Sequence, residues 1–430
     1  MPDINTSQRS TNPLTWLIDP LQPTGDGARE AYRTRLSGRA WALPLLVGAA
    51  LLVVSAVGWA VNPSRFYFSY LTGWVFCLSL ALGSLFFVMV HHAVRARWFT
   101  VVRRVPEALA WSFPLLALLF IPILFGMHDL FHWTAEGIAT EGSGHFDEII
   151  AGKKPYLNAP FFYARMVLYF AVWTYLAYRI YTLSLRQDGP RQDEEEENIA
   201  DGLLYTSVWG LPVYALTTTF ASFDLLMSLD PHWFSTIFGV YFFAGSFLGG
   251  IAVSALFYLG LQRSGMLRRI VTTEHYHDFG KYLFAFTAFW AYIAFSQYVL
   301  IWYSGIPEET VWFRHRFEHG WDYHTLALVF GHFAFPFLFL MPRFTKRLKA
   351  TLGFMAVWML VMQWFDMHWL VVPNYGLHHE AHGTFHWLDF TCALGLLAVM
   401  LGVTLWRLRR HALVPQRDPH LRDSLRFTNL

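Results

Sequence analysis

Carboxyl and imidazole groups occur inside, or at the ends of, long apolar stretches of this sequence. The segment ASFDLLMSLDPHWFST, residues 221–236, places Asp224 in such a stretch, and LVFGHFAFPFLF, residues 328–339, does the same for His332. Both group types accept and release protons near neutral pH. The chemistry they indicate is therefore proton transfer or hydrogen bonding to a ligand, and the same reasoning applies to His128, Asp129, Asp366, His368 and Asp389.

Each of these groups also has a structural interpretation. A charged side chain deep in a bilayer costs about 2.5–3.5 kcal/mol by insertion scales, so a chain retains it for a reason. Asp224 either carries protons or contacts a ligand, or it forms a structural bond to a neighbouring helix, with Ser222 and Ser228 close by in sequence. His332 either hydrogen-bonds across helices or relays protons.

Other positions near the predicted helix ends have simpler explanations. Asp366 and His368 are as consistent with interfacial positions as with function. Asp230 followed by Pro231 is typical of a helix start, with the aspartate as the N-cap. The acidic residues at 194–197 are most simply a solvated charge run.

The composition defines the environment of these groups. Of the 430 residues, 55% are hydrophobic, 18% aromatic and only 14% charged, and the mean hydropathy is +0.34. These values are typical of a polytopic membrane protein. A spanning helix needs about 20 apolar residues, and we predict about ten such segments, at 41–61, 70–92, 106–127, 161–184, 203–228, 234–260, 280–303, 322–341, 350–370 and 384–407.

The distribution of lysine and arginine predicts the orientation. With the N-terminus in the cytoplasm, the inner loops collect most of the basic residues, and the outer side keeps little more than Arg65, Lys153, Lys154, Arg314 and Arg316. This asymmetry predicts cytoplasmic termini and an even number of spans. Most of the acidic and histidine residues then lie toward the outer face.

Several classes of site are disfavoured by the motifs. Cys77 and Cys392 are far apart within apolar runs and suggest neither a disulfide nor a thiolate metal site. The sequence contains no Cys-x-x-Cys-His haem attachment motif, no P-loop and no dinucleotide-binding fingerprint. We therefore predict no metal and no covalently bound cofactor, and expect electrons to be handled by a bound quinone or by another subunit. Gly245 and Gly249 predict close helix packing.

The sequence resembles a known family at several of these segments. The helix junction SFDLLMSLDPHWFSTIFGVYFF, the segment GMHDLFHW and the proline-bearing KKPYLNAPFFYARMVLYF are similar to the membrane subunits of alternative complex III, a quinol:cytochrome c oxidoreductase. These subunits are related to the NrfD and polysulfide reductase C proteins. The length and the histidine-rich outer loops resemble the ActF type more than the larger ActC type.

The resemblance implies an all-α integral membrane fold with two four-helix bundles and two flanking helices. Its segments would be a cytoplasmic extension at 1–40, a flanking helix and loop at 41–69, a first bundle at 70–228, a second bundle at 229–370, a loop and flanking helix at 371–407, and a cytoplasmic tail at 408–430. It also implies location in the bacterial inner membrane.

The resemblance further implies site residues and partners. His128, Asp129 and Asp224 would line an outer quinone pocket, while His332, Asp366, His368 and Asp389 would handle protons. Quinone or menaquinone would be the ligand. The haems and iron–sulfur clusters would belong to partners, namely multihaem cytochrome and iron–sulfur subunits beside an ActC-type sister and small membrane subunits, with lipids and without nucleic acid.

Three functions remain open on the sequence alone. The chain could support quinol oxidation and proton transfer, or it could keep the scaffold while the sister subunit holds the quinol site. It could be a structural anchor for peripheral redox subunits. It could also be a secondary transporter, for which Pro212 and Pro336 would mark broken helices.

Overall fold

The computed structural model describes residues 38–189, 193–318, 320–379 and 384–429, and these ranges contain helices and no strand. The predicted N-terminal extension, apart from its last residues, and the histidine-containing loop at 380–383 lie outside the described residues. The chain is an all-α membrane protein, because its long helices are overwhelmingly apolar.

Eight segments in the described ranges are long and apolar enough to cross a membrane. Five are the single helices α3 (Gly38–Val61), α4 (Pro63–Ala93), α12 (Phe238–Arg263), α13 (Thr273–Ser304) and α19 (Trp387–Arg410), and a sixth lies within α18 (Lys349–His379). The seventh, Arg104–Phe125, is divided into α5 (Arg104–Ala110), α6 (Phe113–Leu118) and α7 (Ile121–Phe125). The eighth, Trp321–Leu340, is divided into α15 (Trp321–Ala327), η4 (Leu328–Ala334) and α16 (Phe335–Leu340).

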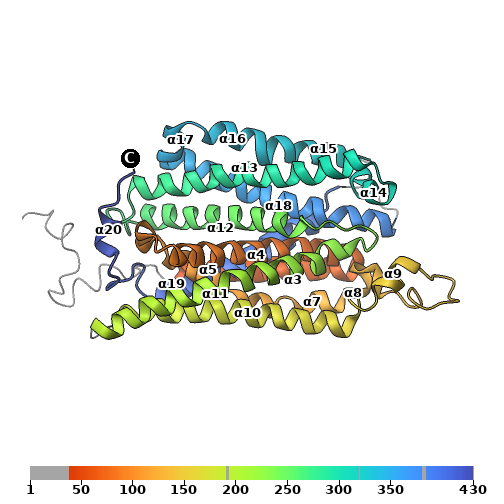
Figure 1. The fold of residues 1–430 in the computed structure, drawn as a ribbon, viewed down its shortest axis with the longest axis horizontal. Coiled ribbons are helices and arrows are strands. Elements are labelled where there is room, and N and C mark those ends of the chain that lie inside the picture. The colour runs from red at the N-terminus through yellow and green to blue at the C-terminus, as the bar shows by residue number, and fades with distance from the viewer. Residues whose placement is uncertain (1–37, 190–192, 319, 380–383, 430) are drawn as a thin grey trace, which may run out of the picture.

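Two further long helices lie alongside these eight. Helices α10 (Ala159–Arg186) and α11 (Asp193–Leu225) have 28 and 33 residues and run parallel to the bundle in Figure 1. They occupy the positions expected for the fourth and fifth spans, but neither is among the eight segments that are apolar enough to qualify as spans. The count of ten spans therefore stays a prediction.

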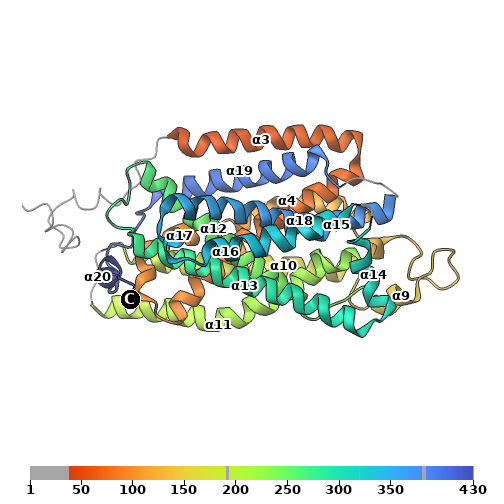
Figure 2. The ribbon, with the colours of Figure 1, turned by 90° about the horizontal axis from the view of Figure 1, so that it is seen from above.

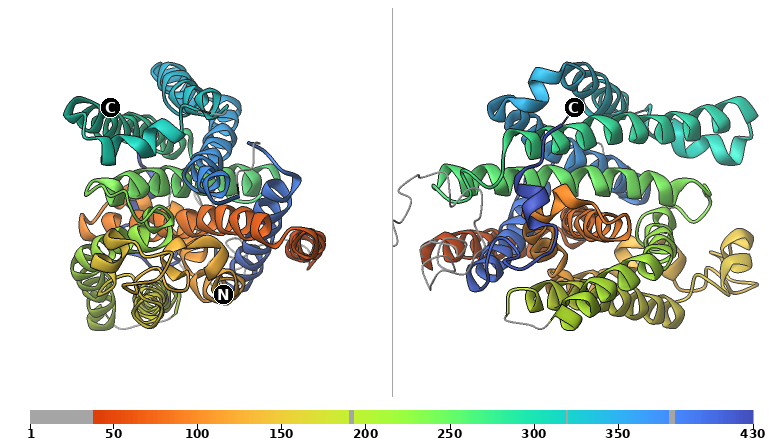
Figure 3. Two further views of the ribbon diagram at one scale, coloured as in Figure 1. Left: turned by 90° about the vertical axis from the view of Figure 1, so that its right-hand side faces the viewer. Right: turned by 60° about the vertical axis from the view of Figure 1, so that its left-hand side comes forward.

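Helix α4 forms the centre of the molecule. It packs against α11, α12, α18 and α19, and 89% of its most apolar window is buried, compared with 11% for α3. Figure 2 shows α3 at the edge of the molecule, where it packs on α19. The left view in Figure 3, along the long axis of the molecule, shows the other helices grouped around this centre. The apolar surface of α3 is therefore left for lipid.

Asparagine and proline define where helices α4 and α10 begin. Asn62 caps α4 by accepting the N–H of Arg65 at 3.0 Å, with Pro63 as the first helical residue. Asn158 caps α10 in the same way, accepting the N–H of Phe161 at 3.0 Å. A capping oxygen satisfies a free helical N–H, and proline has none to satisfy.

Proline also explains why two of the spans are irregular. Pro114 and Pro122 stand at the starts of α6 and α7, where the third span is interrupted. Pro336 follows η4, a π-helical turn that contains His332. Because proline cannot donate to the carbonyl four residues earlier, here that of His332, the regular helix is interrupted at this histidine.

The helix start predicted at Asp230 is wrong. Helix α12 begins at Phe238, and Asp230 instead follows the short helix η3 (Met227–Leu229). Its carboxylate accepts the backbone N–H of His232 at 3.2 Å. Aspartate stabilises a turn through this local bond as readily as it caps a helix, so the residue type alone did not distinguish the two.

The remaining elements are short, and all but α20, which follows the last long helix, connect the long helices. They are η1 (Arg97–Val102), α8 (Met127–Leu130), η2 (His132–Thr134), α9 (Glu148–Lys153), α14 (Pro307–His315), α17 (Arg343–Arg347) and α20 (Leu421–Leu425). Helices α9 and α14 lie at one end of the molecule and α20 at the other (Figure 1). We refer to these as the α9 end and the α20 end.

The predicted glycine face of α12 does pack closely. A Cβ at Gly245 would lie 2.6 Å from the side-chain oxygen of Gln363, and one at Gly249 would lie 2.7 Å from Leu80. The closest backbone approach, however, joins α12 to α4 through other small residues. A Cβ at Gly83 would lie only 1.9 Å from the carbonyl oxygen of Ser246.

We expect Gly83→Ala to separate α4 from α12 and to destabilise the protein by about 1–3 kcal/mol, the usual cost of overpacking. The measurement is the thermal unfolding midpoint in detergent. Gly260→Ala in α12 is the control, because a Cβ there meets no atom within 4 Å. Equal midpoints for the two variants would contradict the close contact.

Candidate functional site

Asp224 is held by an ion pair between α10 and α11. Arg165 of α10 donates from Nε to one carboxylate oxygen at 2.8 Å and from a terminal nitrogen to the other at 2.7 Å. The hydroxyl of Tyr169 donates to the same carboxylate at 2.8 Å. The arginine also lies 3.9 Å above the ring of Tyr156. Asp224 is fully buried, and its charge is neutralised by the bidentate interaction with Arg165.

This geometry supports the structural interpretation of Asp224. Ser222 and Ser228 bond to backbone carbonyls rather than to the carboxylate. The partner that sequence reasoning missed is Arg165, and a signal for it existed, since an arginine inside a predicted apolar helix also requires a counter-charge.

Asp389 is the centre of a second buried ion pair. Arg65 of α4 lies 2.5 Å from one of its oxygens, and the hydroxyl of Ser69 donates to the other at 2.6 Å. The backbone N–H of His386 donates to the same carboxylate at 2.8 Å. These bonds join the start of α4 to the start of α19.

His368 of α18 extends this cluster. Its Nε2 lies 3.2 Å from the Asp389 carboxylate, while its Nδ1 is buried without a partner among the described residues. The ring of His324 lies nearly parallel to it, with centroids 6.0 Å apart. The structure therefore unites His368 and Asp389, two of the predicted proton-handling residues.

Asp366 has a different environment. Its carboxyl group accepts hydrogen bonds from the hydroxyl of Tyr241 and, at 3.3 Å, from the indole N–H of Trp290. The side chain is buried, and no lysine, arginine or histidine of the described ranges pairs with it. A buried carboxyl group without a cation is most stable when protonated, so Asp366 is suited to taking up and releasing a proton.

His332 lies on the other side of Trp290. The two rings are 3.9 Å apart between centroids, and the histidine is completely buried. Neither of its ring nitrogens forms a hydrogen bond of normal geometry within the described part of the chain. Asp366, Trp290 and His332 thus form one buried group, which unites the other two predicted proton-handling residues.

The structure separates the three residues predicted to form the outer quinone pocket. His128 is exposed and lines a cavity of about 290 Å³ beside α9 and the start of α10, and neither Asp129 nor Asp224 lines that cavity. Asp129 instead accepts a hydrogen bond from Ser64. Asp224 is occupied by Arg165.

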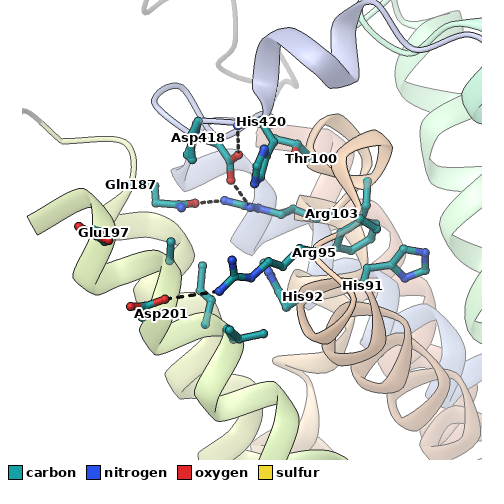
Figure 4. Close-up of a pocket in the computed structure, with 16 residues that line it drawn as sticks. His91, His92, Arg95, Thr100, Arg103, Gln187, Glu197, Asp201, Asp418 and His420 are labelled. Carbon is teal, nitrogen blue, oxygen red and sulfur yellow. Dashed lines mark hydrogen bonds and ion pairs between the residues drawn. The ribbon is translucent and has the colours of Figure 1, made fainter. Parts of the chain in front are cut away.

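A polar cavity of about 410 Å³ opens at the α20 end (Figure 4). In Figure 4, Arg103 extends between Gln187 and Asp418, and Arg95 points toward Asp201. The polar side chains that line the cavity are those of His91, His92, Arg95, Thr100, Arg103, Gln187, Glu197, Asp201, Asp418 and His420.

A buried carboxylate lies behind this cavity. The Nε of Arg103 is 3.4 Å from Glu107, whose other oxygen accepts the hydroxyl of Ser184 at 2.9 Å. The first oxygen has no hydrogen-bond partner among the described residues, and the Nε2 of His92 is likewise buried and unpartnered. The cavity therefore ends at Arg103, which contacts this buried carboxylate.

Comparison with known proteins adds no assignment to this geometry. No protein-family model matches the chain, and no curated protein matches it either. Within the described residues, no cluster of three or more histidine, cysteine, aspartate or glutamate side chains is placed to hold a metal ion.

We expect Asp224→Asn to destabilise the protein by about 3–5 kcal/mol, because it leaves the Arg165 guanidinium buried without its counter-charge. The double change Arg165→Met with Asp224→Leu removes both charges, and we expect it to recover most of that loss. Thermal unfolding in detergent measures both effects. If the double variant were no more stable than the single one, the ion pair would not be the reason for the loss.

The C-terminal tail allows a pH test. Burial opposes ionisation of Asp418, but Arg103 at 2.5 Å and the N–H of His420 together hold the pKa of this carboxyl group below its usual range. The stabilisation is therefore present above the unfolded-state value of about 3.9 and is lost as the pH falls through the lower folded-state value.

We expect Asp418→Asn to lower the thermal midpoint by the same amount between about pH 5 and 8, and the difference from the unmodified protein to shrink as the pH falls below about 4. Asp423→Asn is the control. Its pair with Arg97 joins side chains that are 49% and 67% exposed and should contribute little. A difference that persisted in acid would contradict the ionic origin.

Proposed function

We propose that this chain is a membrane subunit of a quinol-oxidising respiratory complex of the alternative complex III kind, and that it transfers protons released or taken up during turnover. The partners would be an ActC-type sister subunit together with iron–sulfur and multihaem cytochrome subunits, which hold the redox centres. The α9 end would face the periplasm, and both termini would lie in the cytoplasm of a bacterial cell.

The observation that carries the proposal is the environment of Asp366. Its only hydrogen-bond donors in the described ranges are the neutral groups of Tyr241 and Trp290. Oxidation of one quinol releases two protons with two electrons, so a site of this kind needs a buried group that changes its protonation state. General acid–base groups of this type typically contribute about 10²–10⁴-fold to a rate.

The remaining geometry supports the same proposal. Helices α5 and α11 pack on α4, with α10 on α11, while α13 and α18 pack on α12, with α16 on α13; α18 also packs on α4 and α11 on α12. This grouping is consistent with two four-helix bundles, provided that α10 and α11 cross the membrane. The cavity at the α20 end offers a route for proton uptake toward Glu107.

We expect Asp366→Asn to lower quinol-driven cytochrome c reduction by the purified complex by about 10²-fold, because an amide cannot accept the proton. Asp366→Glu should restore part of the rate, and the number of protons released per electron should fall in the asparagine variant.

Glu141→Gln is the matched control, since it neutralises an exposed loop carboxylate. If the Asp366→Asn variant assembled normally and kept full turnover, the proposal would be contradicted.

A second function is favoured by the two buried ion pairs. Arg165–Asp224 and Arg65–Asp389 fix helices without needing to titrate, as a structural anchor for peripheral redox subunits requires. The same experiment separates the two functions. An anchor loses assembly when its ion pairs are broken, but its turnover does not depend on Asp366.

A further inference from the structure

An apolar cavity of about 760 Å³ opens on the side of the molecule, between α13 and the segment formed by α15, η4 and α16. Tyr292 and Phe295, which border it on α13, are each 67% exposed on an apolar surface. In a membrane, this opening faces hydrocarbon rather than water.

The cavity is closed on its inner side by the hydrogen-bonding partners of Asp366. Tyr241 and Trp290 both line it, and both donate to that carboxyl group. Gln297 and Thr325 add two neutral polar groups to the wall. The carbonyl oxygen of the Gln297 side chain accepts the hydroxyl of Ser235 at 3.0 Å, which leaves its amide nitrogen as a donor.

The rest of the wall is apolar and largely aromatic. Ala288, Ala291 and Ala294 recur at helical spacing on α13, and their small side chains leave the space that opposes Val329 and Phe333. Along α13 the lining extends from Ala288 to Tyr298, which is about 15 Å at 1.5 Å per residue.

We propose that this cavity binds the quinol or quinone itself, with the ring against Tyr241 and Trp290 and the prenyl chain along α13. The inference rests on the proposed function and adds to it a binding site within this chain. The ring oxygen would then lie next to the two donors that connect to Asp366. This position differs from the pocket at His128, Asp129 and Asp224 expected from the sequence.

The charge and shape of the lining select this occupant over a phospholipid. None of the residues lining the cavity is acidic, basic or histidine, so nothing in the wall would neutralise a phosphate or an ammonium group. A quinone ring is uncharged, and its flat face can stack on aromatic side chains. The volume lies within the range of about 300–1,000 Å³ typical of small-molecule sites.

The test uses the intact complex and a photoreactive azidoquinone, with the labelled peptides identified by mass spectrometry. The expected label falls on the segments that line the cavity, at residues 241, 288–298, 313–317, 325–337 or 369, and is competed by an unlabelled short-chain quinone. Ala291→Trp fills the cavity, and we expect it to lower the labelling by about tenfold, because the indole takes the space that the quinone ring would occupy.

Two further variants guard against misfolding and non-specific effects. Val329→Trp narrows the cavity from the opposite wall and should lower the labelling as Ala291→Trp does. Leu300→Trp adds the same ring to α13 at a position that is 65% exposed and outside the cavity lining, so its labelling should be unchanged.

The outcomes distinguish the binding site from the proposed function. Label that maps elsewhere, or that a photoreactive phospholipid displaces as well as quinone does, overturns the binding site even if the complex oxidises quinol and depends on Asp366. Label in the cavity that survives both tryptophan substitutions also overturns it. A complex that binds the probe in this cavity but does not oxidise quinol overturns the proposed function and leaves the binding site standing.

Discussion

A carboxyl group removed from water must either have a cation beside it or carry a proton, because an isolated charge in an apolar medium is very costly. Three buried aspartates of this chain satisfy that constraint in two ways. Asp224 and Asp389 are paired with Arg165 and Arg65, whereas Asp366 accepts bonds from neutral groups alone. The contrast separates groups that hold the structure together from the group suited to proton transfer.

The paired aspartates build the frame in which Asp366 sits. Arg165–Asp224 joins α10 to α11, and Arg65–Asp389 joins α4 to α19, with α18 attached through His368. The close approach of α4 and α12 at Gly83 brings the two groups of helices into contact. Helix α18 is therefore fixed by its packing on α4 and α12, so that Asp366 meets Tyr241 of α12 and Trp290 of α13.

The backbone near Asp366 and Trp290 is irregular. The π-helical turn at residues 328–334 carries His332, and the same turn lines the lateral cavity beside α13 through Leu328, Val329 and Phe333. Such turns occur often at functional sites, because they redirect side chains without ending the helix. Here the turn presents His332 to Trp290, the residue that also bonds Asp366. One tryptophan thus connects the histidine, the carboxyl group and the cavity.

The sequence by itself determined the class of the protein and the approximate positions of its long helices, since the apolar composition of a segment is a local property. It missed the helix start at Asn62–Pro63, because it placed the second span at 70–92. It also drew attention to His332, Asp366, His368 and Asp389, because an ionisable residue within or beside an apolar run is easily recognised. That Asp366 and His368 are buried rather than interfacial was shown only by the structure. It misplaced the helix start at Asp230, where two local bonds compete for one side chain. Only the tertiary structure decided which acid is paired with an arginine and which is bonded by Tyr241 and Trp290. Those partners are 55 or more positions away from the acids in sequence. The sequence contains 20 tyrosines and 19 tryptophans, and nothing local indicates which of them contacts a given aspartate.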